Sequence, residues 1–188
     1  MNEQYKDCNI ELDILIDKVG DTQMQRDEYA YIASFLKCSN FLVFGTGYDS
    51  NYWRCVNKCG HTVFLEDDPD WIDSANDIIQ VEYTSKRFQY LDFMEEYLNG
   101  NYKNLKIKLP KKVTDVEWDV IYVDAPVGNS DTAPGRMQSI FAARELATPN
   151  TDIFVHDCDR LVEDLYTSKM FDETVKNQLK LRHLRKKN

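Results

Sequence analysis

The segment from residue 40 to residue 68, NFLVFGTGYDSNYWRCVNKCGHTVFLEDD, constrains the fold more than any other part of this chain. It begins with an apolar run at 41–44 and the glycine turn Gly45-Thr46-Gly47, and it ends with a second apolar run at 62–65 that leads into Glu66. A strand, a glycine loop, a helix, a second strand and a terminal acid make up the nucleotide-binding half of a Rossmann-type sheet. Glu66 follows Gly45 by 21 positions, close to the spacing of about 20 residues at which such an acid binds ribose hydroxyls.

The glycine loop lacks the third glycine of a dinucleotide site, because its pattern is Gly-x-Gly-x-x-Ser and ends at Ser50. A dinucleotide places its pyrophosphate at the N-terminus of the following helix, where the carboxylate of Asp49 would repel it. The same carboxylate suits the ammonium group of S-adenosylmethionine. The loop therefore favours a methyl donor, and an NAD-dependent oxidoreductase is the alternative.

Apolar runs and helical spacings alternate along the rest of the chain. Further strands are predicted at 78–83, 120–123, 152–155 and 179–184. Helices are predicted at 70–75, 88–98, 137–146 and 161–171. This alternation predicts an α/β fold with a mostly parallel sheet and helices on both faces. We expect one domain over 1–188, in which residues 1–39 form a helical N-terminal cap and residues 40–188 form the Rossmann-like core.

The bulk composition excludes several classes of protein. A chain of 188 residues suffices for one domain with a sizeable core. A net charge of −9 disfavours nucleic acid as a partner, because phosphate neutralisation supplies most of that affinity. The chain has no apolar run of about 18 residues, and its N-terminus is polar and acidic, unlike a signal peptide. We therefore expect a cytoplasmic protein without a membrane anchor.

The cysteines point to the same compartment. There are five of them, an odd number without a Cys-x-x-Cys pair: Cys8, Cys38, Cys55, Cys59 and Cys158. No second pair of metal ligands accompanies them, so a structural zinc site is not expected. We predict five free thiols in a reducing compartment.

Acidic and basic side chains follow the predicted strands where a ligand would bind. Asp124 follows the run at 120–123, and His156 and Asp157 follow the run at 152–155. Ligands of open α/β sheets bind beyond the carboxyl ends of the strands, so these groups should converge with Asp159 nearby. They could deprotonate a hydroxyl that attacks a methyl sulfonium, or they could hold a divalent cation. The structural alternatives are a core histidine at 156 and a helix-capping acid at 124.

Two arginines are candidates for binding the acceptor. Arg136 follows Ala133-Pro134-Gly135 and could clamp a substrate carboxylate through two hydrogen bonds. Its alternative role is that of an exposed cation at the start of a helix. Asp159 and Arg160 could contact the substrate or pair with each other on the surface.

Six blocks of the sequence resemble the plant glucuronoxylan 4-O-methyltransferase family, the polysaccharide-biosynthesis domain of the irregular-xylem proteins. The resemblance runs from about Tyr29 to Phe171, and the blocks come in the same order. They are FLVFGTGYDSNYW, TVFLEDDPDWI, VEYT, WDVIYVDAPVG, APGRM and VHDCDRLVE. The APGRM block and the His-Asp-x-Asp-Arg block are the specific ones.

The resemblance implies a class I S-adenosylmethionine fold and methyl transfer to the 4-hydroxyl of glucuronic acid. It implies that the methionine end of the donor is lined by Gly45, Gly47, Asp49 and Ser50. It implies that Glu66 holds the ribose, with Asp67 beside the adenine. The acceptor hydroxyl would be surrounded by the catalytic residues Asp124, His156 and Asp157, together with Asp159. The acids Asp124, Asp157 and Asp159 are the candidate ligands of a divalent cation, and Arg136 or Arg160 would meet the uronate carboxylate.

The chain also departs from the plant pattern. The plant proteins have a membrane anchor that we do not expect here, and we expect a reduced C-terminal end of the sheet. The sequence therefore does not favour a xylan or another glycan over a free or nucleotide-linked uronic acid as the acceptor. The alternative function is a non-catalytic glycan-binding or scaffold protein that retains the fold.

Overall fold

The computed structural model describes residues 24–186. The first half of the predicted N-terminal cap, including Cys8, lies outside this range. In the second half of the predicted cap, helix α2 spans Arg26–Ala33. It is followed by β1 at Asn40–Phe44, the first strand of the sheet.

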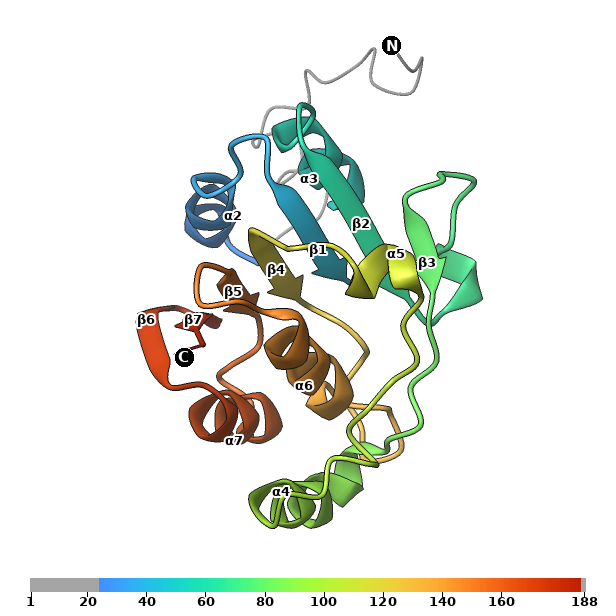
Figure 1. Ribbon diagram of the computed structural model, residues 1–188, viewed down its shortest axis with the longest axis vertical. Coiled ribbons are helices and arrows are strands. Elements are labelled where there is room, and N and C mark those ends of the chain that lie inside the picture. Colours follow the sequence, from blue (N-terminus) through green and yellow to red (C-terminus); the bar gives the residue numbers. More distant parts are fainter. Residues whose placement is uncertain (1–23, 187–188) are drawn as a thin grey trace.

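A single seven-stranded sheet forms the centre of the described chain (Figure 1). Its other strands are β2 (His61–Glu66), β3 (Ile78–Gln80), β4 (Val120–Val123), β5 (Asp152–Val155), β6 (Glu173–Gln178) and β7 (Leu181–Arg185). The strand order is β3-β2-β1-β4-β5-β7-β6. Strands β1 to β5 are parallel, and β7 is antiparallel to both of its neighbours. The predicted α/β fold with a mostly parallel, Rossmann-like sheet is confirmed.

Helices cover both faces of this sheet. The remaining ones are α3 (Ser50–Val56), α4 (Tyr90–Leu98), α5 (Lys111–Thr114), α6 (Met137–Leu146) and α7 (Leu161–Met170), with 3₁₀ turns η3 (Pro69–Trp71) and η4 (Arg87–Gln89). Successive side chains of a strand point to opposite faces. Phe41 and Val43 of β1 accordingly pack with Trp53 of α3, whereas Leu42 and Phe44 join the larger core of α4 to α7. In Figure 1, α2 and α3 lie at the top of the view and α4 at the bottom.

The C-terminal end of the sheet differs from the prediction. We expected a reduced end with one strand at 179–184, but β6 and β7 form an antiparallel hairpin around Leu179, whose φ is 54°. Strand β6 is exposed along almost its whole length, because it lies at the edge of the sheet. It therefore carries no alternating apolar pattern from which a strand could be predicted.

The prediction of free thiols was wrong for two of the cysteines. Cys38 and Cys59 form a disulfide across 21 positions of sequence. Each precedes a strand by two residues, and those strands are paired in parallel so that Asn40 lies opposite His61. Spacing along the sequence does not reveal this pair, because the register of two strands brings the cysteines together.

The disulfide also removes the support that free thiols gave to a reducing compartment, because disulfides persist mainly in oxidising compartments. Cys55 and Cys158 keep their thiols, and burial raises the pKa of Cys158 to about 12. Within residues 24–186, none of the helices is both long and apolar enough to cross a membrane.

Candidate active site

A cavity of about 570 Å³ opens at the carboxyl ends of the parallel strands. Its walls come from the residues that follow β1, β2, β4 and β5. The chain order reverses between β1 and β4, and ligands of open α/β sheets bind at such a switch point. The sheet topology therefore gives this cavity the position of a cofactor site.

The glycine loop reaches the cavity through a close backbone approach. Gly45 has a φ of 113°, and a Cβ there would lie 2.8 Å from Ala125 Cβ, so that only glycine fits. The hydroxyl of Ser50 accepts a hydrogen bond of 2.9 Å from the Gly47 N–H and thereby closes the loop. Gly45 and Gly47 line the main cavity, whereas Ser50 lines a smaller neighbouring cavity of about 220 Å³.

Asp49 presents a carboxylate to the cavity next to this loop. Its Oδ2 accepts hydrogen bonds from Trp53 Nε1 at 2.9 Å and from the Tyr29 hydroxyl at 3.4 Å. Burial and the neighbouring charge of Asp124 raise the pKa of Asp49 to about 6. Two carboxylates that repel each other across a cavity attract a cationic ligand.

Glu66, the last residue of β2, and Asp67, which follows it, line the cavity. Glu66 is buried, and its carboxylate accepts hydrogen bonds from the Thr46 N–H at 2.7 Å and the Thr46 hydroxyl at 2.8 Å. It also accepts hydrogen bonds from the backbone N–H groups of Asp67 and Asp68. These bonds join the end of β2 to the glycine loop. Burial and the charge of Glu66 raise the pKa of Asp67 to about 6.

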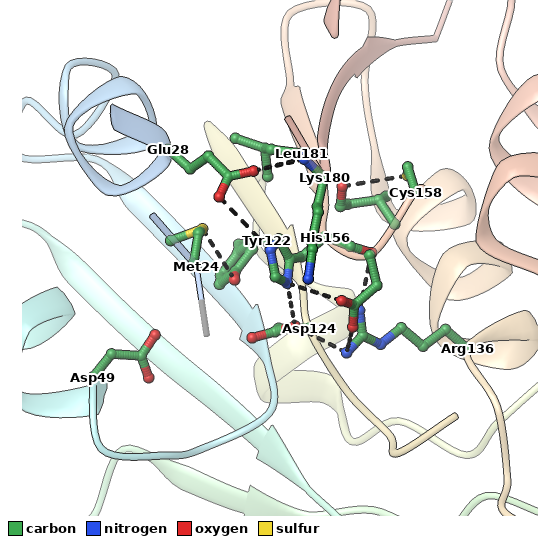
Figure 2. A network of polar contacts seen from close by, with 12 residues as sticks. Met24, Glu28, Asp49, Tyr122, Asp124, Arg136, His156, Cys158, Lys180 and Leu181 are labelled. Atoms are coloured by element: carbon green, nitrogen blue, oxygen red, sulfur yellow. Dashed lines mark hydrogen bonds and ion pairs between the residues drawn. The ribbon is translucent and has the colours of Figure 1, made fainter. Parts of the chain in front are cut away.

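Asp124 and His156 lie side by side across the cavity from Asp49 (Figure 2), and Asp157 forms a compact cluster with them. His156 Nδ1 lies 3.2 Å from Asp124 Oδ1 and 3.6 Å from Asp157 Oδ1. Asp157 has a φ of 60°, a strained backbone conformation for a residue with a side chain. The three residues that were predicted to be catalytic are thus brought together.

The guanidinium of Arg136 holds the two carboxylates of this cluster. Its Nη2 lies 2.9 Å from Asp124 Oδ1 and 2.8 Å from Asp157 Oδ2, and Nη1 donates to the His156 carbonyl at 2.9 Å. Burial alone would raise the pKa of Asp124, but Arg136 and the hydrogen bond with His156 hold it at about 2. Burial alone would lower the pKa of His156, but Asp124 and Asp157 together leave it raised.

The three predicted substrate residues occupy different environments. Arg136 is 4% exposed and turned toward internal partners. Arg160 lies at the cavity wall with 41% of its side chain exposed and its Nη1 3.0 Å from Asp157 Oδ2. Asp159 is exposed and is not among the residues that line the cavity. Arg160 is therefore the arginine available to a ligand.

Three side chains of the cluster have the arrangement of a cation site. Ligand atoms of Asp124, His156 and Asp157 lie within 4.8 Å of one another. Carboxylate oxygen and imidazole nitrogen are donors that divalent metals accept, so the donor types fit. Asp159, which was predicted as a third acid ligand, is not part of this group. Because Arg136 already pairs with both acids, an ion would use their remaining oxygens.

Glu28 of α2 belongs to the same network and was missed by the sequence reading. It is 1% exposed, and its Oε2 lies 3.9 Å from His156 Nε2. It stands one helical turn before Ile32, which is fully buried. An acid on the apolar face of a helix was the available signal, because a buried carboxylate requires polar partners.

The chain is similar in sequence to a family of known proteins. The protein-family model described as IRX15/IRX15L/GXM matches residues 28–102 and 85–184. Glucuronoxylan 4-O-methyltransferase 2 of Arabidopsis thaliana is 39% identical over 150 residues, which cover 68% of this chain and 52% of that protein. Arabinogalactan O-methyltransferase 2 of the same plant is 36% identical over 165 residues, which cover 73% of this chain and 56% of that protein. The chain thus spans little more than half the length of these relatives.

Solved structures match in fold. A candidate caffeoyl-CoA O-methyltransferase of Staphylococcus aureus superposes with a TM-score of 0.55 at 12% identity, covering 94% of this chain and 93% of that one. The methyltransferase PaMTH1 of Podospora anserina, solved with S-adenosylhomocysteine, has a TM-score of 0.53 at 14% identity, covering 100% and 89%. At these identities the likeness concerns the fold, which is that of class I methyltransferases.

Proposed function

The chain belongs to the IRX15/IRX15L/GXM family, and from this premise we propose that it is an S-adenosylmethionine-dependent sugar O-methyltransferase. The proposed acceptor is the 4-hydroxyl of glucuronic acid, free or within a glycan. One observation carries the proposal. The cation-attracting carboxylate of Asp49 and the Asp124–His156 pair face each other across one cavity at the switch point of the sheet.

We assign the methionine end of the donor to the glycine loop. Gly45 and Gly47 leave room for the backbone to approach, and Asp49 receives the ammonium group. Glu66 and Asp67 lie where the ribose and adenine of the donor belong in this fold. Ser50 supports the loop through Gly47 and contributes indirectly.

We assign the general base to His156. The pKa of Asp124 is held at about 2, which makes its carboxylate a weak base, whereas the pKa of His156 is raised. As the hydroxyl oxygen of the acceptor attacks the methyl carbon, the C–S bond breaks and the hydroxyl proton passes to the imidazole. Asp124 and Asp157 stabilise the imidazolium that forms, and Arg136 keeps both carboxylates ionised.

Recognition of the acceptor is assigned to Arg160. Its exposed guanidinium lies at the wall of the cavity beside the catalytic cluster. A guanidinium binds a carboxylate in a fork geometry, which suits a uronate. The names of the two relatives refer to glucuronoxylan and arabinogalactan, and these names support a glycan acceptor.

A divalent cation held by Asp124, His156 and Asp157 is the alternative to base catalysis by His156, because an imidazole nitrogen that binds the ion cannot accept the hydroxyl proton. When bound, it would lower the pKa of the acceptor hydroxyl as a Lewis acid. Titration of the chelator-treated protein with Mg²⁺, Mn²⁺ and Co²⁺, followed by calorimetry, tests this assignment. Loss of the heat signal in Asp157→Asn would locate the ion at the cluster.

The experiment for the whole proposal has two stages. Calorimetry first compares S-adenosylhomocysteine with NAD, and methyl transfer is then assayed by mass spectrometry on glucuronoxylan, arabinogalactan and free glucuronate. Asp124→Asn and His156→Ala should abolish turnover and leave product binding in place. Tight binding of S-adenosylhomocysteine without transfer to any uronate would favour a non-catalytic glycan-binding protein. Near-normal rates in both variants would show that the catalytic assignment is wrong.

A further inference from the structure

Exposed lysines gather outside the cavity on the segment that connects α4 to α5 and on the start of α5 (Figure 1). Between Glu96 and Asp115 the sequence has no acid and five lysines, all of them exposed: Lys103, Lys106, Lys108, Lys111 and Lys112. None of the five makes an ion pair within residues 24–186. The whole chain has a net charge of −9, so residues 103–112, the lysine segment, reverse the charge of the surface locally.

The backbone of the lysine segment is anchored by the apolar residues that alternate with its lysines. Leu105 is fully buried, and Ile107 and Leu109 pack against the same core. Lys106 and Lys108 lie between them in sequence and are exposed. The ammonium groups are therefore presented to solvent from a backbone that the core holds in place.

A second basic cluster, in the hairpin of β6 and β7, is used for internal contacts instead. Arg182 Nη2 lies 2.6 Å from Asp164 Oδ1, and Arg185 Nη2 lies 2.7 Å from Asp152 Oδ1. These cations hold the hairpin to α7 and β5. The lysine segment differs in that its charges have no such partners among the described residues.

A buried glutamine joins the lysine segment to the connection between β3 and η4. Gln138 of α6 is fully buried, and its Oε1 accepts hydrogen bonds from the N–H groups of Thr84 and Ser85. Its Nε2 donates to the Asn104 carbonyl at 2.8 Å. These two stretches of chain therefore lie side by side.

The same connection contacts the loop that forms one wall of the cavity. The N–H of Arg87 donates to the Ala133 carbonyl at 2.8 Å, and Arg87 Nε donates to the Ser130 carbonyl at 3.1 Å. This loop also supplies Gly128 and Asn129 to the cavity wall. The molecular surface thus runs from the cavity past Arg87 to the lysine segment.

We propose that the lysine segment binds an acidic polysaccharide, a polymer that carries carboxylates on several of its sugars. Resting on the proposed function, the inference is that one uronate of the polymer enters the cavity while further carboxylates along the same chain meet Lys103, Lys106 and Lys108. A lysine ammonium acts as a point charge on a flexible stem, so it tolerates carboxylates in varied orientations. A polyanion is repelled by the rest of this acidic protein and attracted to the one segment.

The surroundings of the lysines favour a glycan over two other polyanions. Binding to an anionic membrane would use apolar side chains that enter the lipid beside the lysines, but Leu105, Ile107 and Leu109 are turned into the core. Nucleic acid is disfavoured by the net charge of the chain. Continuity with a cavity whose wall presents Arg160 to a uronate points to a polymer of the same chemistry.

Binding is tested first, without any assay of methyl transfer. Calorimetry compares glucuronan, a polymer of glucuronate, with unsubstituted xylan, which is uncharged. Glucuronan should bind more tightly, and its affinity should fall as salt is added, because exposed charges are screened. Equal affinity for the two polymers, or an affinity that does not depend on salt, would overturn the proposal.

Lys106→Ser/Lys108→Ser removes two charges and leaves the apolar anchors of the segment in place. Affinity for glucuronan should fall by about 2- to 30-fold, the loss expected for two exposed ion pairs, while affinity for S-adenosylhomocysteine stays that of the parent. The matched control is Lys37→Ser/Lys58→Ser, which removes the same charge from exposed positions before β1 and β2, at the end of the sheet opposite the cavity. It should bind glucuronan as the parent does. Parent-like binding by the first variant, or equal losses in both, would refute the role of the segment.

Kinetics and competing polyanions separate this proposal from the proposed function. In Lys106→Ser/Lys108→Ser, KM should rise for glucuronan, whereas kcat and the KM for free glucuronate, which occupies the cavity alone, should not change. Polyuridylate or phosphatidylserine vesicles that bind the parent more tightly than glucuronan, and lose this binding in the variant, would assign the segment to nucleic acid or membrane and overturn the proposal. If the parent transfers no methyl group to any uronate, the proposed function fails, while calorimetry with glucuronan still decides the role of the lysine segment.

Discussion

The carboxylates of Asp49 and Asp124 are electrostatically coupled across the cavity, and the charge of Asp124 helps to raise the pKa of Asp49 to about 6. The loop after β1 and the end of β4 bring these two acids together. The buried guanidinium of Arg136 compensates Asp124 but makes no ion pair with Asp49 among the described residues. A bound cationic ligand should therefore lower the pKa of Asp49 and favour its ionised form.

Donor binding should consequently depend on pH. As pH falls through about 6, Asp49 takes up a proton, and the affinity for S-adenosylhomocysteine, whose amino-acid end keeps the ammonium, should fall. Asp49→Asn should bind more weakly and lose this dependence. Calorimetric titrations between pH 5 and pH 8, a range that spans the pKa of about 6 of Asp49, measure both effects. An unchanged affinity across this range would contradict the role given to Asp49.

The same substitution should leave the ligand-free protein as stable or more stable. Because the folded pKa of Asp49 lies above the unfolded value of 3.8, the protein loses stability as pH rises between the two values. The upper limit of this penalty is about 3 kcal/mol at 1.36 kcal/mol per pKa unit. Asp49→Asn removes the penalty, so its urea midpoint at neutral pH should equal or exceed that of the parent. A clearly lower midpoint would show that Trp53 and Tyr29 stabilise the carboxylate more than burial penalises it.

Removing Arg136 should destabilise the protein strongly. Arg136→Met leaves the buried carboxylate of Asp157 and the neighbouring Asp124 without their shared cation. Loss of one partner of a buried ion pair costs about 3–5 kcal/mol, and urea unfolding at neutral pH measures it. Without Arg136, the pKa of Asp124 should rise from about 2 toward its ordinary value. Acidic pH then protonates this carboxylate in the variant and removes its charge, so the loss of stability should be smaller there. A loss that does not change with pH would point to packing alone.

Arg160→Ala tests acceptor recognition with little effect on stability. The side chain is 41% exposed, and the buried carboxylate of Asp157 keeps its ion pair with Arg136 when Arg160 is removed. We expect KM to rise for glucuronate-containing acceptors and donor affinity to stay constant. Equal KM values for parent and variant would exclude Arg160 as the uronate contact.

Gly45 and Gly100 form a matched pair for the glycine loop. Both have positive φ, 113° and 77°, but a Cβ at Gly45 meets Ala125 at 2.8 Å, whereas one at Gly100 meets nothing within 4 Å. Alanine at either position should cost about 1 kcal/mol or more of backbone strain. Only Gly45→Ala should also abolish binding of S-adenosylhomocysteine in calorimetry. Weak binding in both variants would mean that global stability limits the site.

Reduction of the Cys38–Cys59 disulfide should lower stability. A disulfide that closes a loop of this size contributes about 2–4 kcal/mol. Thermal unfolding with and without a reductant measures the effect, and the Cys38→Ser/Cys59→Ser double variant should match the reduced parent. If alkylation and mass spectrometry find both thiols free in protein purified without reductant, the pair is not oxidised under those conditions.

The sequence predicted the parts of the site that follow local rules. The strand at 120–123 and the helix at 137–146 were predicted with the bounds that the structure has, because apolar periodicity reports burial directly. Glu28, the inward direction of Arg136 and the disulfide all depend on contacts between distant segments. Arg136 follows a proline-glycine turn at the start of α6, and its position alone does not tell whether the side chain enters the core or the solvent. Strand β6 was missed because an exposed edge strand has no apolar alternation.

The acidic lining of the cavity has a consequence for turnover under the proposed function. Six carboxylates and two guanidinium groups line it, so its wall discriminates between ligands by charge. The sulfonium of the donor disappears when the methyl group leaves, and the spent cofactor has lost part of its attraction to this wall. An anionic acceptor is repelled from the interior and held at Arg160, so that its ring enters with the carboxylate outermost. Product dissociation and the choice of one hydroxyl on the ring would then have a common electrostatic origin.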